Sequence, residues 1–224
     1  MNQTPIHLVI FDCDGVLVDS EPLGNRVFVQ MLREHGFEVN EEKYLKKFIG
    51  KTLPDRIATV AGEFNWSPPE NFLPIFHERL ADLSDRELEV VPGIQELINN
   101  LDVPIAIASN GTRKEIIHRL EYSNLTERFG NAIFSGMEVP NPKPAPDVYL
   151  AAAKAFDVHP SNCFVVEDSI PGVTAAVRAG MKVYGHAAFT PVDALKEAGA
   201  IPFANMFELK EIFAREFLQV QLNS

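Results

Sequence analysis

Two aspartates stand directly after an apolar run near the beginning of the chain. Residues 8–11 read LVIF, and Asp12 and Asp14 follow them, with Asp19 a little further along. Charged side chains are rarely buried unless they have a partner, so carboxylates at the tip of so apolar a segment require an explanation. Their position raises the question of which cation or which reaction they serve.

Small polar or acidic residues also follow two later apolar runs. Ser109 and Asn110 end one such run, and Glu167 and Asp168 end another. In open parallel sheets, ligands bind beyond the carboxyl ends of the strands. A single acidic strand end would be explained as a helix cap, but three such ends favour a common site.

The carboxylates of such a site need positive charge around them. Clustered carboxylates raise one another's pKa values unless a cation lies among them, and hard oxygen ligands favour Mg²⁺. A second source of positive charge is Lys143, which stands between Pro142 and Pro144 in NPKPAPD (141–147). Proline restricts its own backbone and that of the residue before it, so this frame favours a positioned lysine.

The elements that position these residues are indicated by the hydrophobic pattern. Short apolar runs rich in Val, Ile and Phe are typical of strands buried on both faces. They cover residues 7–11, 104–109, 131–136, 163–167 and 181–185. Helical patterns lie between most of them, at residues 92–101, 112–124, 145–158 and 172–180. Strands that alternate with helices predict an α/β fold with a parallel sheet.

Residues 20–90 interrupt that alternation. They contain helical patterns, such as residues 21–36, and no convincing strand pattern. We therefore expect an α/β core made of residues 1–17 and 91–224, with an all-helical domain inserted as residues 18–90.

Composition limits the partners of the protein. The formal net charge of −11 disfavours general nucleic-acid binding, because a phosphate backbone would be repelled. No apolar run approaches the roughly 20 residues that span a bilayer, and the chain does not open with a signal-peptide pattern. The two cysteines, Cys13 and Cys163, are typical of buried thiols in a reducing compartment. We expect a cytoplasmic protein without membrane or nucleic-acid partners, and a monomer is compatible with the sequence.

Taken in order, these motifs resemble those of the haloacid dehalogenase (HAD) superfamily, in its phosphatase and phosphomutase branch with a helical cap. The first is DCDGVLVD (12–19), the second is the strand end at Ser109, the third is Lys143 in KPAPD, and the fourth is VVEDSIPGVTAAVRAG (165–180). The resemblance covers essentially the whole chain, and four motifs in order are very specific. It implies a Rossmann-like parallel-sheet core with an inserted α-helical cap.

The resemblance implies catalytic and metal-binding roles for four acidic residues. Asp12 resembles the nucleophile that takes the phosphoryl group as an aspartyl phosphate, and Asp14 resembles the general acid and base. Mg²⁺ would be held by Asp12, the backbone carbonyl of Asp14 and Asp168, with Glu167 as a ligand directly or through water. The metal would neutralise charge so that the anionic nucleophile can approach an anionic phosphate.

The resemblance also implies a set of substrate-binding residues. Ser109 and Lys143 would bind the phosphate oxygens, assisted by backbone N–H groups near Asn110. The cap would close over a small phosphorylated metabolite, a sugar or sugar-acid phosphate, and exclude water. Its loop FIGKTLPDRI (48–57) would carry the specificity, with Lys51 as the expected contact.

A sugar phosphomutase of the same family is the main alternative. Such mutases carry a cap histidine where this chain has Gly24, and a cap arginine where it has Leu53. Both departures favour hydrolysis, and the stretches SNGT and FSG resemble sugar-acid phosphatases. A haloacid dehalogenase usually lacks the second aspartate, and a non-catalytic protein on this fold would be expected to have lost Asp12 or Lys143. Both of these classes are therefore less favoured.

Overall fold

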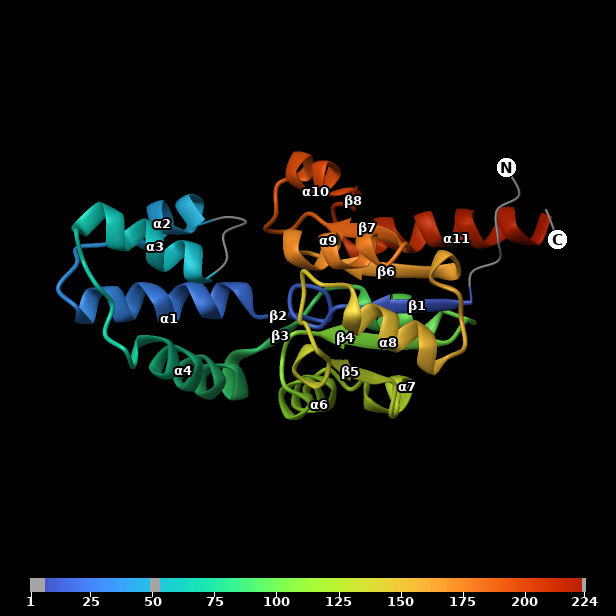
Figure 1. Cartoon of the computed structure of the whole chain (residues 1–224), viewed down its shortest axis with the longest axis horizontal. Coiled ribbons are helices and arrows are strands. Elements are labelled where there is room, and N and C mark those ends of the chain that lie inside the picture. The colour runs from blue at the N-terminus through green and yellow to red at the C-terminus, as the bar shows by residue number, and fades with distance from the viewer. Residues whose placement is uncertain (1–6, 49–52, 223–224) are drawn as a thin grey trace. The chain divides into compact units, whose positions relative to one another are not determined.

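The computed structural model describes residues 7–48 and 53–222, and the chain divides into two compact units (Figure 1). One unit combines Met1–Asp19 with Glu89–Ser224, and we call it the α/β unit. The other is the continuous stretch Ser20–Leu88, and we call it the helical unit.

A six-stranded parallel sheet lies at the centre of the α/β unit (Figure 1). Its order is β5-β4-β1-β6-β7-β8, which places β1 between β4 and β6. The strands are β1 (Leu8–Phe11), β4 (Ile105–Ser109), β5 (Ile133–Ser135), β6 (Cys163–Glu167), β7 (Lys182–His186) and β8 (Ile201–Phe203). The predicted α/β fold class is confirmed. The pattern missed β8, because three residues with a central proline carry little strand signal.

Helices cover both faces of this sheet. They are α5 (Ile94–Asn99), α6 (Arg113–Tyr122), α7 (Thr126–Phe129), α8 (Asp147–Ala155), α9 (Ile170–Arg178), α10 (Val192–Ala198) and α11 (Met206–Leu222). Two short 3₁₀ turns, Gly136–Glu138 and Pro160–Asn162, complete the connections between β5 and β6.

The first strand shows why the sequence forms a strand buried on both faces. Successive side chains of a strand point to opposite faces, so an unbroken apolar run supplies two cores at once. Leu8 and Ile10 belong to the cluster that includes Val148 of α8 and Val173 of α9. Phe11 faces the other way and packs edge-on against Phe129 of α7, with ring centroids 6.1 Å apart.

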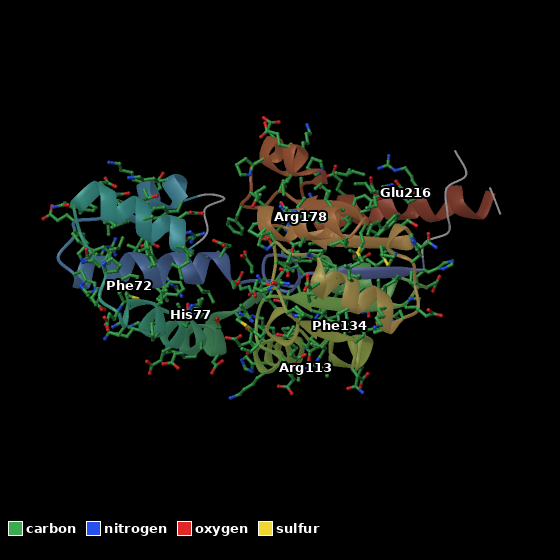
Figure 2. All side chains as sticks on the ribbon, viewed as in Figure 1. Phe72, His77, Arg113, Phe134, Arg178 and Glu216 are labelled. Atoms are coloured by element: carbon green, nitrogen blue, oxygen red, sulfur yellow. The ribbon has the colours of Figure 1, made fainter. Side chains whose placement is uncertain are left out.

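The helical unit has a core of its own, made largely of aromatic rings. Its helices are α1 (Glu21–Glu34), α2 (Glu41–Phe48), α3 (Leu53–Phe64) and α4 (Phe72–Glu87). Phe28 of α1 is fully buried, and its ring meets those of Phe48, Phe72 and Phe76 in edge-on contacts (Phe72 is labelled in Figure 2). Because these rings pack against one another, the inserted stretch of chain has a hydrophobic core of its own.

A partly buried set of polar contacts ties α1 to α3 within the helical unit. Arg56 of α3 donates one hydrogen bond of 2.7 Å to Oδ1 of Asn25 and another of 2.8 Å to Oε2 of Glu21. Both partners lie in the first turns of α1. These contacts therefore fix the beginning of α3 against the beginning of α1.

A short antiparallel ribbon stands where the chain leaves and re-enters the α/β unit. Its strands are β2 (Val18–Asp19) and β3 (Glu89–Val90), and Val18 pairs with Val90. Two-residue strands carry too little alternation for the sequence pattern to predict them. Among the helices of the described residues, none is long and apolar enough to cross a membrane.

Candidate active site

The carboxyl ends of three adjacent strands bring the acidic and polar residues together. Asp12 follows β1 directly, Ser109 is the last residue of β4, and Glu167 is the last residue of β6. The Asp12 backbone N–H donates to the carbonyl of Val166 at 2.9 Å, which continues the β1–β6 ladder into the site. The convergence that the sequence predicted for these strand ends is present in the sheet order.

Lys143 reaches the centre of this edge from the loop before α8. Its Nζ lies 2.5 Å from Oδ1 of Asp12, 2.6 Å from Oε1 of Glu167 and 2.8 Å from the carbonyl of Ala108. The side chain is only 4% exposed. Burial alone would lower the pKa of Lys143, but the two carboxylates raise it well above its usual range. The lysine is therefore a fixed positive charge next to Asp12.

Asn110 holds the backbone of Lys143 in place. Its Oδ1 accepts from the Lys143 N–H at 2.9 Å, and its Nδ2 donates to the Lys143 carbonyl at 3.2 Å. A Cβ at Gly136 would lie 2.5 Å from Oδ1 of Asn110, so only glycine allows this approach. The side chain of Asn110 thus supports the loop that carries Lys143. Arg178 of α9 supports the same loop through a 3.0 Å hydrogen bond to the carbonyl of Pro144 (Figure 2).

Glu167 is fully buried, and both of its carboxylate oxygens accept hydrogen bonds. Oε1 accepts from Lys143 and, at 2.9 Å, from the hydroxyl of Tyr149. Oε2 accepts from the backbone N–H of Asp168 at 2.9 Å and from the N–H and hydroxyl of Ser169 at 3.0 and 2.9 Å. Burial raises the pKa of Glu167, but Lys143 and these donors outweigh it and lower the pKa overall. The role of Tyr149 was not predictable from the sequence, because a tyrosine inside a helical pattern gives no sign of its partner.

Asp12 is buried among charges of both signs. Its pKa is raised to about 7, chiefly by burial and also by Glu167 and Asp14, while Lys143 opposes the rise. Lys143 alone therefore does not bring the pKa of this carboxyl back to its usual range. An additional cation beside Asp12 would favour the ionised form.

The donors present fit a hard divalent cation. Carboxylate oxygens of Asp12, Glu167 and Asp168 lie within 4.8 Å of one another. Asp168 rests against the backbone of Gly15, where φ is +72° and a Cβ would lie 2.1 Å from Oδ2 of Asp168. Only glycine leaves room for this carboxylate, and an all-oxygen donor set suits Mg²⁺.

The two remaining polar residues of the site lie at its edges. Ser109 is buried, and its Oγ accepts from the backbone N–H of Gly111 at 3.1 Å. Asp14 is partly exposed, and its Oδ1 lies 3.1 Å from Nε of Arg119 on α6. Sequence analysis did not single out Arg119, which reads as an ordinary residue of an amphipathic helix. Lys51 lies outside the described residues, so its expected contact with substrate stays a prediction.

A buried histidine supports the loop between Asp12 and β2 from behind. Nδ1 of His186, at the end of β7, lies 2.8 Å from the carbonyl of Gly15, and the ring stacks on Phe203 with centroids 5.2 Å apart. Burial lowers the pKa of His186. Because a carbonyl can only accept, Nδ1 carries a proton and donates a hydrogen bond to Gly15. The histidine holds the loop and does not reach the carboxylates.

Taken together, the residues of this edge offer a cluster of carboxylates whose donors fit a cation, a buried aspartate and a fixed ammonium group. Comparison with known proteins points to the family that the motifs resemble. The family model of haloacid dehalogenase-like hydrolases matches residues 9–186. The chain is 31% identical over 209 residues to 6-phosphogluconate phosphatase of Escherichia coli, covering 93% of this chain and 95% of that protein. It is 32% identical over 213 residues to phosphorylated carbohydrates phosphatase of Thermotoga maritima, covering 91% and 96%.

Solved structures agree with these sequence matches. A conserved haloacid dehalogenase-like protein from Agrobacterium tumefaciens shares the fold with a TM-score of 0.85 and 30% identity, covering 94% of this chain and 99% of that one. The chain therefore belongs to the haloacid dehalogenase-like hydrolase family. Within that family it is a phosphatase, a phosphoric monoester hydrolase.

Proposed function

We propose that this phosphatase is Mg²⁺-dependent and hydrolyses a small phosphomonoester, a sugar or sugar-acid phosphate, through an aspartyl phosphate on Asp12. The observation that carries the proposal is the setting of Asp12, a buried carboxylate with Nζ of Lys143 at 2.5 Å and two further acidic residues around it. Sugar and sugar-acid phosphates are the substrates in the names of the Thermotoga maritima and Escherichia coli relatives.

Each residue has a defined part in the proposed reaction. The Asp12 carboxylate attacks phosphorus, while Asp14 gives a proton to the oxygen of the departing alcohol. Asp14 then takes a proton from the water that hydrolyses the acyl phosphate. Lys143 and Ser109 hold phosphate oxygens, so the charge that the phosphate brings meets a preorganised ammonium group.

Asp12, Asp168 and the backbone carbonyl of Asp14 would hold Mg²⁺. Glu167, whose oxygens already accept hydrogen bonds, would contribute through water and by fixing Lys143. When bound, the metal supplies positive charge that offsets the repulsion between carboxylate and phosphate. We prefer hydrolysis to phosphoryl transfer between two positions of a sugar. The sugar phosphomutases that this chain resembles carry a histidine and an arginine where the helical unit has Gly24 and Leu53.

The test is a panel of alkyl phosphates that includes 6-phosphogluconate, glucose 6-phosphate and glycerol 3-phosphate, with p-nitrophenyl phosphate as a generic ester. Phosphate release is measured with Mg²⁺ and scored as kcat/KM. We expect a sugar or sugar-acid phosphate to exceed p-nitrophenyl phosphate, because the non-reacting part of the substrate helps to align it. Conversion of one sugar phosphate into its isomer without phosphate release would instead support the mutase.

A further inference from the structure

Arg119, which contacts Asp14, belongs to none of the four sequence motifs. Arg119 stands on α6, and its Nε lies 3.1 Å from Oδ1 of Asp14, in the loop after β1. The arginine side chain is 16% exposed and the aspartate side chain 36%. The pair therefore joins a helix of the α/β unit to the loop that carries both candidate catalytic aspartates.

The guanidinium of Arg119 lies within the charge field of the site. Burial would lower its pKa, but Asp14, Cys13, Glu115 and Asp12 raise it, so the group is charged at neutral pH. A Cβ at Gly111 would lie 3.4 Å from its Nη1 and 3.5 Å from Oγ of Ser109. One face of the guanidinium therefore adjoins the loop that carries the candidate phosphate-binding serine.

The burial of Arg119 is poorly explained by a contribution to the stability of the fold. The Nη1 atom is buried, and it has no hydrogen-bond partner among the residues that the structure describes. A buried donor without a partner destabilises a fold, and an apolar side chain of similar volume would avoid that loss. A buried group of this kind calls for another explanation, and a role in the reaction is one such explanation.

The helix that carries Arg119 is firmly anchored beside Ser109. Thr112 caps α6 in a capping box, because its side chain accepts from the Glu115 N–H while the Glu115 carboxylate accepts from the Thr112 N–H at 2.7 Å. The loop from Ser109 to Thr112 thus runs directly into a fixed helix start. Arg119 lies one turn beyond Glu115, and a side chain on such an element can hold its partner in one place.

We propose that Arg119 is a positioning residue that holds the Asp14 carboxyl group where it exchanges a proton with the leaving oxygen. This inference rests on the proposed function, in which Asp14 is the general acid and base. Loss of Arg119 would remove the ion pair that orients the partly exposed Asp14 side chain. The productive geometry would then be present for a smaller part of the time.

The transfer of a proton from Asp14 to the departing oxygen makes the inference testable. In the first half-reaction the bond from Asp12 to phosphorus forms, the phosphorus–oxygen bond of the ester breaks, and Asp14 gives its proton to the departing oxygen. An alkoxide is a poor leaving group and needs that proton, whereas p-nitrophenolate departs without it. A displaced Asp14 should therefore slow alkyl phosphates selectively. The parameter kcat/KM includes only the steps up to the first irreversible one. That step is the departure of the alcohol, so kcat/KM reports this half-reaction.

The experiment compares Arg119→Met and Arg119→Lys with the unaltered protein, on the best alkyl phosphate of the panel and on p-nitrophenyl phosphate. General acid catalysis contributes about 10²–10⁴-fold, so partial loss of position in Arg119→Met should lower alkyl kcat/KM by about 10- to 100-fold. The loss on p-nitrophenyl phosphate should stay below about threefold, since little acid catalysis is needed there. Arg119→Lys should recover part of the alkyl activity, because the charge is kept.

Arg113→Met serves as the matched control. Arg113, labelled in Figure 2, lies on the same helix, and its exposed guanidinium pairs with the exposed Glu138. It should leave both kcat/KM values unchanged. If Arg119→Met does not fold, the ratio of the two kcat/KM values in Arg119→Lys decides the question, since a displaced ammonium should still lower the alkyl value selectively.

Asp14→Asn separates failure of this inference from failure of the proposed function. Selective loss on alkyl phosphates in Asp14→Asn, with no further loss when Arg119→Met is added, would support both. No loss in Asp14→Asn would remove the proposed acid and base. Selective loss in Asp14→Asn together with an unchanged substrate ratio in the Arg119 variants would overturn the positioning role alone. Equal losses on both substrates in the Arg119 variants, or faster turnover, would also overturn it.

Discussion

Asp12 is the residue at which activity and stability make opposite demands. Its pKa is raised to about 7, chiefly by burial, so the free protein disfavours the charge that the reaction needs. Asn at this position would keep the volume and remove the charge. We expect Asp12→Asn to lower kcat by more than about 10³-fold, the scale of losing a nucleophile, without lowering the melting temperature. Steady-state kinetics and thermal unfolding of the same preparation check both parts, and activity within tenfold of the original would remove the role of Asp12.

His186 gives a prediction about stability and pH. Its pKa is lowered in the folded state by burial, whereas in the unfolded chain it is about 6.5. The unfolded chain therefore binds more protons in the window below that value, and the free energy of unfolding falls as the pH falls through it. One proton changes this slope by at most about 1.4 kcal/mol per pH unit.

His186→Gln retains a side-chain donor and does not titrate. Its free energy of unfolding should therefore fall less steeply than that of the unaltered protein as the pH is lowered below about 6.5. Urea unfolding at a series of pH values measures the slope. The substitution His159→Gln is the control, since His159 is exposed and contacts Ser161 at the surface. An identical slope for His186→Gln and the unaltered protein would show that His186 is not held neutral.

The residues of the site were predictable from the sequence to different degrees. Asp12, Ser109 and Glu167 follow apolar runs, and the sheet edge where they meet is a direct consequence of parallel strands. The partners Tyr149 and Arg119 were not predictable, because a polar residue within a helix carries no information about what it faces across the chain. Asn110 was expected near phosphate, but which of its groups supports Lys143 becomes visible only in the fold.

At the scale of elements, the turn after β1 depends on a single glycine. Gly15 has φ of +72°, and its missing side chain makes room for Asp168. Gly15→Ala should destabilise the fold by about 1–2 kcal/mol through the backbone and should also displace Asp168, so Mg²⁺-dependent activity should be largely lost. Gly180→Ala is the matched control, because φ there is +79° and a Cβ would meet nothing within 4 Å.

The two alanine variants therefore separate backbone strain from the loss of space. Both should lower the free energy of unfolding by a similar amount, and only Gly15→Ala should lower kcat/KM. Denaturant unfolding and turnover at several Mg²⁺ concentrations measure the two effects. Equal activity in the two variants would show that the contact between Gly15 and Asp168 is unimportant for the reaction.

The elements that the sequence predicted are those with a long, clear pattern. β1, β4 and β6 are buried runs of four or five residues, and α8 and α9 are periodic helices. The helices α7, α10 and α11 were not predicted. The missed strands are β2, β3 and β8, which have two or three residues each. Such short strands exist because a neighbouring strand is already in place, and that is information about the fold rather than the local sequence.

For the whole molecule, the proposal requires a divalent cation. The formal net charge is −11, and the carboxylates of the site add local negative charge that an anionic substrate must approach. EDTA should remove activity, added Mg²⁺ should restore it, and Ca²⁺ should replace Mg²⁺ poorly because it accepts looser geometry and more ligands. Phosphate release after metal removal and re-addition is the measurement, and full activity in excess EDTA would contradict the metal assignment.

The central claim is that the phosphoryl group passes through the chain before it reaches water. The most direct measurement is the stereochemical course at phosphorus. The substrate is phenyl phosphorothioate made chiral with two oxygen isotopes, and the Mg²⁺-loaded protein hydrolyses it in water enriched in the third isotope, so that the thiophosphate product is itself chiral. Each in-line displacement inverts phosphorus, so transfer first to the Asp12 carboxylate and then to water gives overall retention. The account predicts retention. Overall inversion would mean that water attacks the substrate directly, and it would contradict the assignment of Asp12 as nucleophile.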